Sequence, residues 1–266
     1  MKQLKVNGIS FCISQMGPKN APKVLLSNSL GADLSMWDAQ VNALSKKYRV
    51  ISYDTRGHGN TEASEGDYSI ELLADDVLCI MDEIGVEKAH FVGLSLGGLI
   101  GQFLGAHSSD RFESLTLCAT FAASPRQIWI DRIKAVSETG IHPIADETMQ
   151  RWFTKKYLLD NPKIISHVKN MFLTTSTNGY MGCAAAIRDM DLSGIPEQIP
   201  IPTLLISGSQ DPSATPDMMK YLHNLIEGSI YKEIEQAAHL LTLEEPKIVN
   251  KLILDFINKI QSNKNL

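Results

Sequence analysis

The sequence lacks the charge pattern of a nucleic-acid-binding protein. Its 25 Lys and Arg residues are outnumbered by 30 Asp and Glu residues, and no five consecutive charges share one sign. Proteins that bind nucleic acids usually present a basic surface, so we expect no nucleic-acid partner. Internal repeats and low-complexity segments are also absent, and hydrophobic residues make up 44% of the chain. These properties exclude a disordered or fibrous protein and are typical of a globular one.

Cysteine is scarce as well. The chain has four cysteines, which are far apart and form no CxxC pair: Cys12, Cys79, Cys118 and Cys183. We expect reduced, mostly buried thiols and therefore a cytoplasmic location. The N-terminal residues contain neither a long apolar run nor a small-residue cleavage site, so we predict no signal peptide. The seven histidines are scattered without ligand spacing, and we expect no metal site.

One stretch without charge needs a separate interpretation. Residues Ala89–Ser109 contain no Asp, Glu, Lys or Arg, and Gly97, Gly101 and Gly105 stand at four-residue spacing, a pattern found in packed membrane helices. However, glycines and a turn interrupt the run, and the rest of the chain is ordinarily polar. We interpret the stretch as a buried strand, a sharp turn and a buried helix, and we expect no membrane association.

Strand-like and helix-like segments alternate along the chain. The strand-like segments are Leu4–Val6, Ile9–Ser14, Lys23–Ser27, Tyr48–Tyr53, Ala89–Gly93, Ser114–Ala119, Thr203–Ser207 and Ile230–Ile234. Segments with helical character are Tyr68–Ile84, Leu96–His107 and Pro246–Ile260. This alternation predicts an α/β fold with a mostly parallel sheet that helices cover on both faces.

The region from about residue 122 to residue 199 departs from this alternation. It contains amphipathic segments at Ile128–Val136 and Ile164–Phe172 but no clear strand. We therefore predict a core domain formed by residues 1–121 and 200–266, with residues 122–199 inserted after the sixth strand as a helical cap.

A G-x-S-x-G motif occupies Gly93–Gly97. The motif alone is a weak signal, but here it directly follows a predicted strand and begins a predicted helix. That is the arrangement of a nucleophile elbow, in which small residues let strand and helix approach and leave the Ser95 hydroxyl exposed above the sheet. The N-terminus of the following helix offers backbone N–H groups to a developing oxyanion.

A serine nucleophile needs a base at neutral pH. Asp211 and His239 follow the predicted strands Thr203–Ser207 and Ile230–Ile234, in the chain order Ser, Asp, His that accompanies a nucleophile elbow. Both lie where ligands bind in open α/β sheets, beyond the carboxyl ends of strands. Taken singly, each could be an ordinary turn or surface residue. Together they predict a triad in which His239 takes the Ser95 proton and Asp211 holds the imidazole.

These motifs resemble those of the α/β-hydrolase superfamily over nearly the whole chain, and within it those of the 3-oxoadipate enol-lactonases. The narrower resemblance also rests on the segments Ser27–Gly31, Met36–Asp38, Tyr53–Gly59, His90–Gly98, Arg151–Thr154 and Cys183–Asp189. It implies an α/β-hydrolase fold with a mostly parallel eight-stranded sheet flanked by helices. It also implies a serine hydrolase that opens 3-oxoadipate enol-lactone through an acyl-enzyme, in the β-ketoadipate pathway of aromatic-compound catabolism, with no metal or organic cofactor.

The resemblance also assigns an oxyanion hole. Many hydrolases of this fold carry His-Gly after the third strand, and here the matching pair is Ser27-Asn28, a departure that the enol-lactonases share. The donors then fall on the backbone N–H groups of Ser29 and Leu96.

The implied substrate is a small lactone with a carboxylate arm, so the site needs a cation and flat apolar walls. A guanidinium can bind a carboxylate with two parallel hydrogen bonds. The candidate substrate-binding residues all lie in the predicted cap: Trp129, Arg188, Arg132 and Trp152, with Arg126 and Arg151 as further candidates. The arginines could instead be solvated helix residues, and the tryptophans could simply pack the cap. We expect Arg56 and His58 to shape a structural turn near the rim of the site.

Other functions would keep the same triad. A small-ester carboxylesterase, a carbon–carbon bond hydrolase and a perhydrolase differ from a lactonase in the cap, which sequence patterns describe poorly. A non-catalytic binding protein of this fold is less expected, because such proteins often lose a triad member. The expected partner is therefore a small anionic lactone, and nothing in the sequence specifies an oligomeric state.

Overall fold

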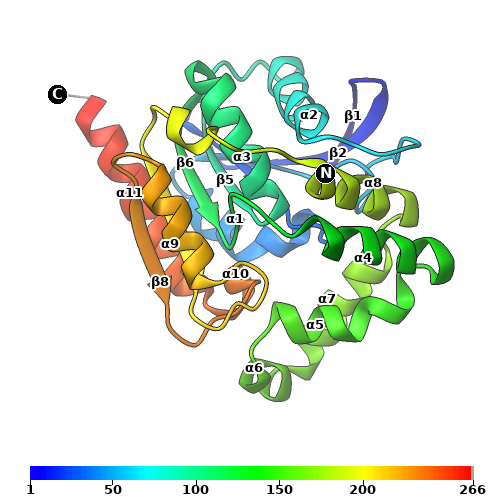
Figure 1. The fold of residues 1–266 in the computed structure, drawn as a ribbon. Helices are drawn as coiled ribbons and strands as arrows, with labels where there is room; N and C mark the ends of the chain where they lie inside the picture. The colour runs from blue at the N-terminus through cyan, green and yellow to red at the C-terminus, as the bar shows by residue number, and fades with distance from the viewer. Residues whose placement is uncertain (265–266) are drawn as a thin grey trace.

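The computed structural model describes residues 1–264, in which helices surround one sheet (Figure 1). The sheet has eight strands in the order β1-β2-β4-β3-β5-β6-β7-β8. The strands are β1 (Lys2–Val6), β2 (Ile9–Met16), β3 (Lys23–Ser27), β4 (Arg49–Tyr53), β5 (Ala89–Leu94), β6 (Phe112–Cys118), β7 (Thr203–Gly208) and β8 (Ile230–Ile234). The pairs β1–β2 and β2–β4 are antiparallel, and the other pairs are parallel. The predicted α/β class with a mostly parallel sheet is confirmed.

Burial follows the position of each strand in the sheet. Every residue of β5 and β7 is buried, which shows that both faces of the sheet are covered there. The edge strands β1 and β8 instead have mostly exposed or half-buried residues. The apolar strand-like runs in the sequence therefore correspond to the centre of the core.

The helices outside the segment between β6 and β7 pack around this sheet. They are α1 (Asp38–Leu44), α2 (Ile70–Glu83), α3 (Leu96–His107), α9 (Pro216–Leu225), α10 (Leu241–Glu244) and α11 (Pro246–Lys264), with short 3₁₀ turns η1 (Leu34–Trp37) and η2 (Ser109–Arg111). The 3₁₀ turn η4 (Pro196–Gln198) lies between β6 and β7 but packs against α3 and α9. The predicted helix at Leu96–His107 is confirmed at both ends. The helices α1, α9 and α10 were not predicted, because they are too short to give a strong periodic signal.

The segment between β6 and β7 is helical, as predicted. It contains α4 (Arg126–Thr139), η3 (His142–Ile144), α5 (Ala145–Trp152), α6 (Lys155–Asp160), α7 (Pro162–Leu173) and α8 (Thr177–Asp189). These helices lie together in Figure 1, from α8 on the right down to α6 at the bottom, and we call them the cap helices. The division into a core domain and a cap domain stays a prediction.

The backbones of core and cap helices touch at two glycines. A Cβ atom on Gly57 would lie 2.2 Å from the Gly179 Cα, so neither position accepts a side chain without a shift of backbone. A hydrogen bond from Ser176 N–H to Gly57 O, 3.2 Å long, joins the same segments. The start of α8 is thereby held against the loop after β4. Among the described residues, no helix is long and apolar enough to cross a membrane.

Candidate active site

Ser95 occupies a strained turn between β5 and α3. Its φ of 56° and ψ of −111° lie in a region that non-glycine residues rarely adopt. The turn is tight because a Cβ atom on Gly93 would lie 2.2 Å from Gly97 O, and one on Gly97 would lie 2.3 Å from Ser27 O. Two hydrogen bonds hold it, from Ser95 N–H to Cys118 O (2.9 Å) and from the Thr120 hydroxyl to Ser95 O (3.0 Å). This geometry is that of a nucleophile elbow.

The other two members of the predicted triad meet beyond β7 and β8. His239 Nδ1 lies 2.8 Å from Asp211 Oδ2, and both side chains are buried. The second carboxylate oxygen, Asp211 Oδ1, accepts the N–H groups of Ser213 (2.7 Å) and Ala214 (3.1 Å). Since an ionised carboxylate only accepts hydrogen bonds, Nδ1 carries the proton and the other ring nitrogen is left as a base. The loops after β7 and β8 are thus built to orient one imidazole.

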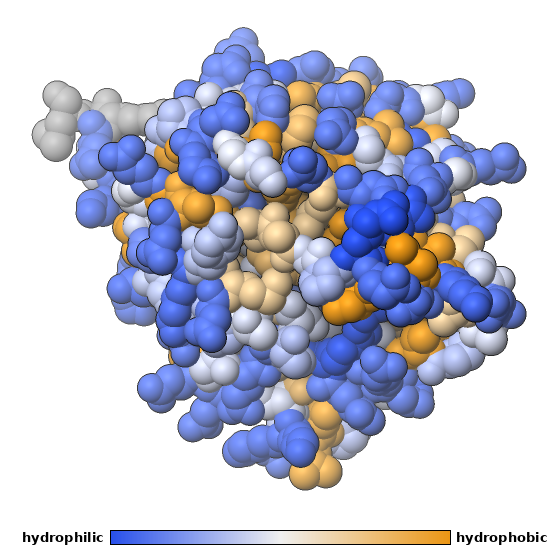
Figure 2. All heavy atoms as spheres, in the orientation of Figure 1, coloured by the Kyte–Doolittle hydropathy of each residue, from blue (hydrophilic) through white to orange (hydrophobic). Residues whose placement is uncertain are grey.

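A cavity of about 230 Å³ contains Ser95 and His239 in its wall. The remaining lining residues come from the core loops and from the cap helices: Ser29, Leu30, Phe121, Ser124, Ile128, Trp129, Arg132, Thr148, Arg151, Trp152, Phe172, Tyr180, Pro212 and Ser213. The wall is therefore aromatic on the cap side. Figure 2 shows paler and orange surface between the regions of α9 and α4, surrounded by hydrophilic side chains.

The loop after β3 lies beside the elbow and is held by its side chains. Asn28 Oδ1 accepts the Trp37 indole N–H at 2.9 Å, and Asn28 Nδ2 donates to Tyr53 O at 3.0 Å. Ser29 lines the cavity, and its N–H donates to Met36 Sδ at 3.5 Å, a weak acceptor. Leu96 is the first residue of α3, where a helix leaves its N–H groups without intrahelical partners.

His58 also holds the loop after β3 in place. His58 Nε2 accepts the Gly31 N–H at 2.9 Å, which assigns the proton to Nδ1 and a hydrogen bond to Arg56 O at 3.1 Å. Burial lowers the pKa of His58 to about 4, so the ring is neutral at physiological pH. The structural role predicted for His58 matches these contacts, which support the loop that carries Ser29.

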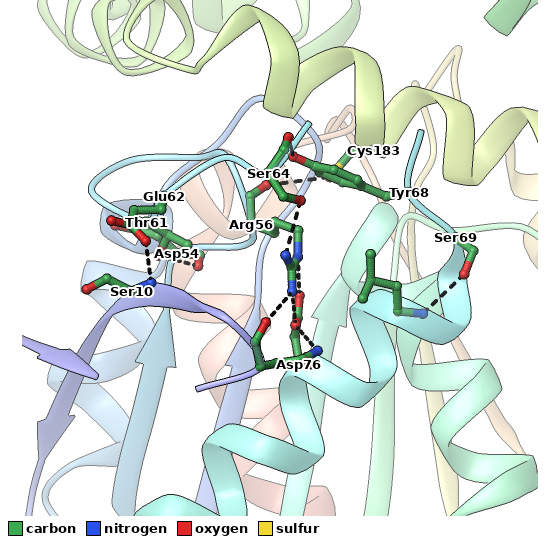
Figure 3. A network of polar contacts seen from close by, with 12 residues as sticks. Ser10, Asp54, Arg56, Thr61, Glu62, Ser64, Tyr68, Ser69, Asp76 and Cys183 are labelled. Atoms are coloured by element: carbon green, nitrogen blue, oxygen red, sulfur yellow. Dashed lines mark hydrogen bonds and ion pairs between the residues drawn. The ribbon is translucent and has the colours of Figure 1, made fainter. Parts of the chain in front are cut away.

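Arg56 likewise serves the fold. Its guanidinium makes two hydrogen bonds to Asp76 on α2, of 2.8 and 2.5 Å, and both side chains are buried (Figure 3). Cys183 of α8 lies against Arg56 O, 3.8 Å from its sulfur. The loop after β4 is therefore tied to α2 and to the cap helices at once. Cys12, Cys118 and Cys183 are buried and Cys79 is half-buried, so the predicted burial of most cysteines is confirmed.

Asp54, at the start of the same loop, is a second buried group with an altered pKa. Its carboxylate accepts the N–H groups of Leu34 (2.7 Å) and Asn60 (2.9 Å). Burial raises the pKa of Asp54 to about 6, despite these hydrogen bonds. Asp54 joins the loops that follow β3 and β4.

Two of the candidate cap arginines reach the cavity. Arg132 lies over the Trp129 ring, with its guanidinium carbon 4.9 Å from the ring centroid. Arg151 Nη2 donates to Thr148 Oγ1 at 3.0 Å, while its buried Nε has no hydrogen-bond partner among the described residues. The nearest carboxylate oxygen to that nitrogen belongs to Glu147, at 3.8 Å. Arg132 and Arg151 thus bring two guanidinium groups to the cavity wall.

Arg188 and Arg126 do not line the cavity, and substrate binding by these two residues stays a prediction. Arg188 donates to Asp67 Oδ2 at 2.7 Å and also pairs with Asp189, and Arg126 pairs with Asp189 at 2.8 Å. These carboxylates hold the pKa of Arg188 above its usual value. Sequence patterns do not fix helix register, which decides which residues of α8 line the cavity. Phe172 and Tyr180 also line it, and they were not predicted as site residues because aromatic residues in amphipathic helices are usually core residues.

The remaining candidates, Trp129 and Trp152, both contribute to the cavity wall. The Trp129 indole donates to Ser124 Oγ at 2.9 Å, and the Trp152 ring packs edge-on against Phe172 with centroids 5.6 Å apart. Among residues 1–264, no group of three or more His, Cys, Asp or Glu side chains is placed to hold a metal ion. The arrangement can therefore supply a nucleophile, an oriented base, backbone donors and an anion-binding wall.

Comparisons with known proteins agree on one family. Residues 22–246 match the model of the alpha/beta hydrolase fold family. Two 3-oxoadipate enol-lactonases of Acinetobacter baylyi are each 35% identical to the chain, over 94% and 96% of it and over 94% and 95% of their own lengths. The crystal structure of an enol-lactonase from Burkholderia xenovorans LB400 superposes with a TM-score of 0.95 at 40% identity, and the match covers 97% of the chain and 100% of that structure.

Proposed function

Because the chain belongs to the α/β hydrolase fold family, we propose that it is a serine hydrolase that opens the lactone ring of 3-oxoadipate enol-lactone to give 3-oxoadipate. That the chain is a hydrolase enzyme follows from its near-full-length similarity to named enol-lactonases. The substrate, the triad mechanism and a role in aromatic-compound catabolism belong to the proposal. So does a cytoplasmic location, which free and mostly buried thiols support.

One observation carries the proposal. A single small cavity is lined by a strained serine, by a histidine that a buried aspartate orients, and by two arginines among aromatic rings. A neutral ester would need the first two features only. The arginines add what a substrate with a carboxylate arm requires, in a protein whose formal net charge is −5.

The first half of the proposed reaction forms an acyl-enzyme. Ser95 Oγ attacks the lactone carbonyl carbon while His239 Nε2 takes the hydroxyl proton. The N–H groups of Ser29 and Leu96 stabilise the negative charge on the carbonyl oxygen, and for Ser29 this oxyanion replaces the weakly accepting Met36 sulfur. Collapse of the tetrahedral intermediate breaks the ring C–O bond, and the leaving enolate oxygen takes the proton from His239.

The second half releases the product. The enol remains attached to the acyl chain and tautomerises to a ketone, which removes the nucleophile that would close the ring again. His239 then takes a proton from water, and the resulting hydroxide equivalent attacks the ester carbonyl of the acyl-enzyme. The intermediate expels Ser95 Oγ, which regains its proton from His239. The net change is addition of one water across the ring ester bond.

The substrate carboxylate would lie between Arg132 and Arg151. Both guanidinium groups line the cavity, and the Trp129 ring beneath Arg132 limits the directions that this side chain can take. Arg132→Ala should therefore raise the KM for the lactone, with a smaller effect on a neutral acetate ester. Arg126→Ala is a suitable control, because Arg126 pairs with Asp189 outside the cavity.

The test follows the ultraviolet absorbance of 3-oxoadipate enol-lactone with wild-type protein and Ser95→Ala, beside a simple acetate ester. We expect fast lactone loss, slow ester loss and an inactive variant. Wild-type turnover by Ser95→Ala would refute the triad. An inert lactone together with Ser95-dependent ester hydrolysis would refute the substrate and favour the small-ester reaction.

A further inference from the structure

A buried carboxylate outside the triad connects the histidine loop to the cap helices. Glu244 is the last residue of α10, five positions after His239, and only 8% of it is exposed. Its Oε1 accepts both the N–H and the hydroxyl of Thr154, each at 2.8 Å, and its Oε2 accepts the Ala238 N–H at 2.5 Å. Burial raises the pKa of Glu244, and these donors offset only part of that rise.

The two residues that donate hydrogen bonds to Glu244 are close in sequence to residues of the candidate site. Ala238 immediately precedes His239 in the chain. Thr154 caps the N-terminus of α6, two residues after Trp152 and three after Arg151, and both of these line the cavity. One carboxylate thus holds the base-bearing loop with one oxygen and the ligand-binding segment with the other.

Two further hydrogen bonds join the same segments. Leu240 N–H donates to Trp152 O at 2.9 Å, and the Tyr157 hydroxyl donates to Leu243 O at 3.0 Å. Residues 152–157 and 238–244 are therefore in contact along their length, although more than 80 residues separate them in the chain. We call this set of contacts the Glu244 clamp.

We propose that Glu244 is a positioning residue that holds His239 in its working position by anchoring the histidine loop to the cap helices at Thr154. The proposal rests on the proposed role of His239 as the base for Ser95. Glu244 does not line the cavity that contains Ser95 and His239. It therefore acts only through the residues that it contacts.

The Glu244 clamp requires a hydrogen-bond acceptor at each of the two terminal atoms of the side chain. Thr154 and Ala238 both present N–H donors, so a carboxylate satisfies both and a carboxamide cannot. In Glu244→Gln, one end of the amide becomes an NH₂ group that faces an N–H donor whichever way the amide is turned. The variant keeps the size of the side chain and loses one of the two anchors.

The test measures labelling of Ser95 by a neutral p-nitrophenyl alkylphosphonate, in which Ser95 Oγ bonds to phosphorus, p-nitrophenolate leaves and His239 takes the serine proton. For Glu244→Gln we expect the maximal labelling rate to fall by about 10- to 100-fold, the range for a misplaced reacting group. The half-saturating probe concentration should stay unchanged, and melting curves should show that the variant is folded at the assay temperature. Glu245→Gln, one position along, is the matched control and should label at the wild-type rate.

A second variant tests the Glu244 clamp by changing Thr154, the residue that donates to Glu244 from the cap helices. Thr154→Val removes the hydroxyl but keeps the N–H and the approximate shape, and it touches neither Ser95 nor His239. We expect it to slow labelling by a smaller factor, and we expect the double variant to label no more slowly than Glu244→Gln, because both changes break one clamp. If Glu244→Gln does not fold, Thr154→Val alone decides the question.

A folded Glu244→Gln variant that labels at the wild-type rate would overturn the proposal, and so would multiplicative effects in the double variant. The probe is neutral and needs no lactone. A wild-type protein that labels at Ser95 but leaves the lactone intact would therefore refute the proposed substrate while the Glu244 result still stands.

Discussion

Replacing Gly97 with alanine should disrupt the point at which the elbow meets the loop after β3. The added Cβ would lie 2.3 Å from Ser27 O and 2.6 Å from Ser27 C. Favourable carbon contacts lie at roughly 3.5–4.0 Å, so one of the two backbones must move by about 1 Å. Ser27 has little freedom to move, because it ends β3, pairs with Gly93 of β5 and shares a hydrogen bond with the Tyr53 hydroxyl at 2.7 Å.

The expected loss of stability is a balance of two terms. Overpacking typically costs about 1–3 kcal/mol, whereas alanine stabilises a helix by about 1 kcal/mol relative to glycine. Because the clash is with backbone atoms, the overpacking cost should lie at the upper end of its range, about 2–3 kcal/mol. The net destabilisation should then be roughly 1–2 kcal/mol, or a fall in Tm of about 2–8 °C for a domain of this size. The effect on catalysis should be larger, because Ser29 follows Ser27 by two residues and a 1 Å displacement can reduce the rate by about 100-fold.

Gly101→Ala provides the matched control for this prediction. It makes the same chemical change one turn later in α3, where the atoms nearest to the new Cβ would be side-chain atoms of Leu117 and Phe91, each at 2.8 Å. Those side chains can shift, so we expect a smaller loss of stability and nearly wild-type activity. Thermal melts and Ser95 labelling rates would be compared for both variants. A Gly97→Ala variant with the Tm and labelling rate of the wild type would refute the argument that this close approach requires glycine.

Two further predictions concern the loop after β4. Asp76→Ala leaves the buried Arg56 guanidinium without its carboxylate and should reduce the unfolding free energy by about 3–5 kcal/mol. As a control, Asp82→Ala breaks the more exposed pair with Arg111 and should reduce it by less than about 1 kcal/mol. Similar urea midpoints for the two variants would contradict this prediction. Stability should also depend on pH through two opposing groups. His58 has a pKa lowered from 6.5 to about 4, so the unfolded chain binds the extra proton and acidification destabilises the fold between these values. Asp54 has a pKa raised from 3.8 to about 6, so the folded chain binds the extra proton and acidification stabilises it over much of the same range. Asp54→Asn should therefore lose Tm more steeply than the wild type as the pH falls from 6 to 4, and parallel Tm profiles would show that Asp54 does not titrate in this way.

The local features of the fold could be predicted because their signals are short-range. The strand runs, the helix at Leu96–His107 and the Gly93–Gly97 elbow each depend on a few adjacent residues, and the structure agrees with them. Short helices such as α9 and α10 escaped detection because one or two turns give little periodicity.

The amino-acid sequence by itself determined the sheet, the elbow and the order of the candidate triad, because apolar periodicity and glycine sterics act within a few residues. Only the tertiary structure decided which cap arginines line the cavity, since the packing of α4, α5 and α8 sets whether Arg132 and Arg151 or Arg188 turn inward. The same holds for Glu244, whose two anchors lie 6 and 90 residues away in the chain. No local pattern encodes such a contact, because it forms only when the cap helices and the histidine loop are folded against each other.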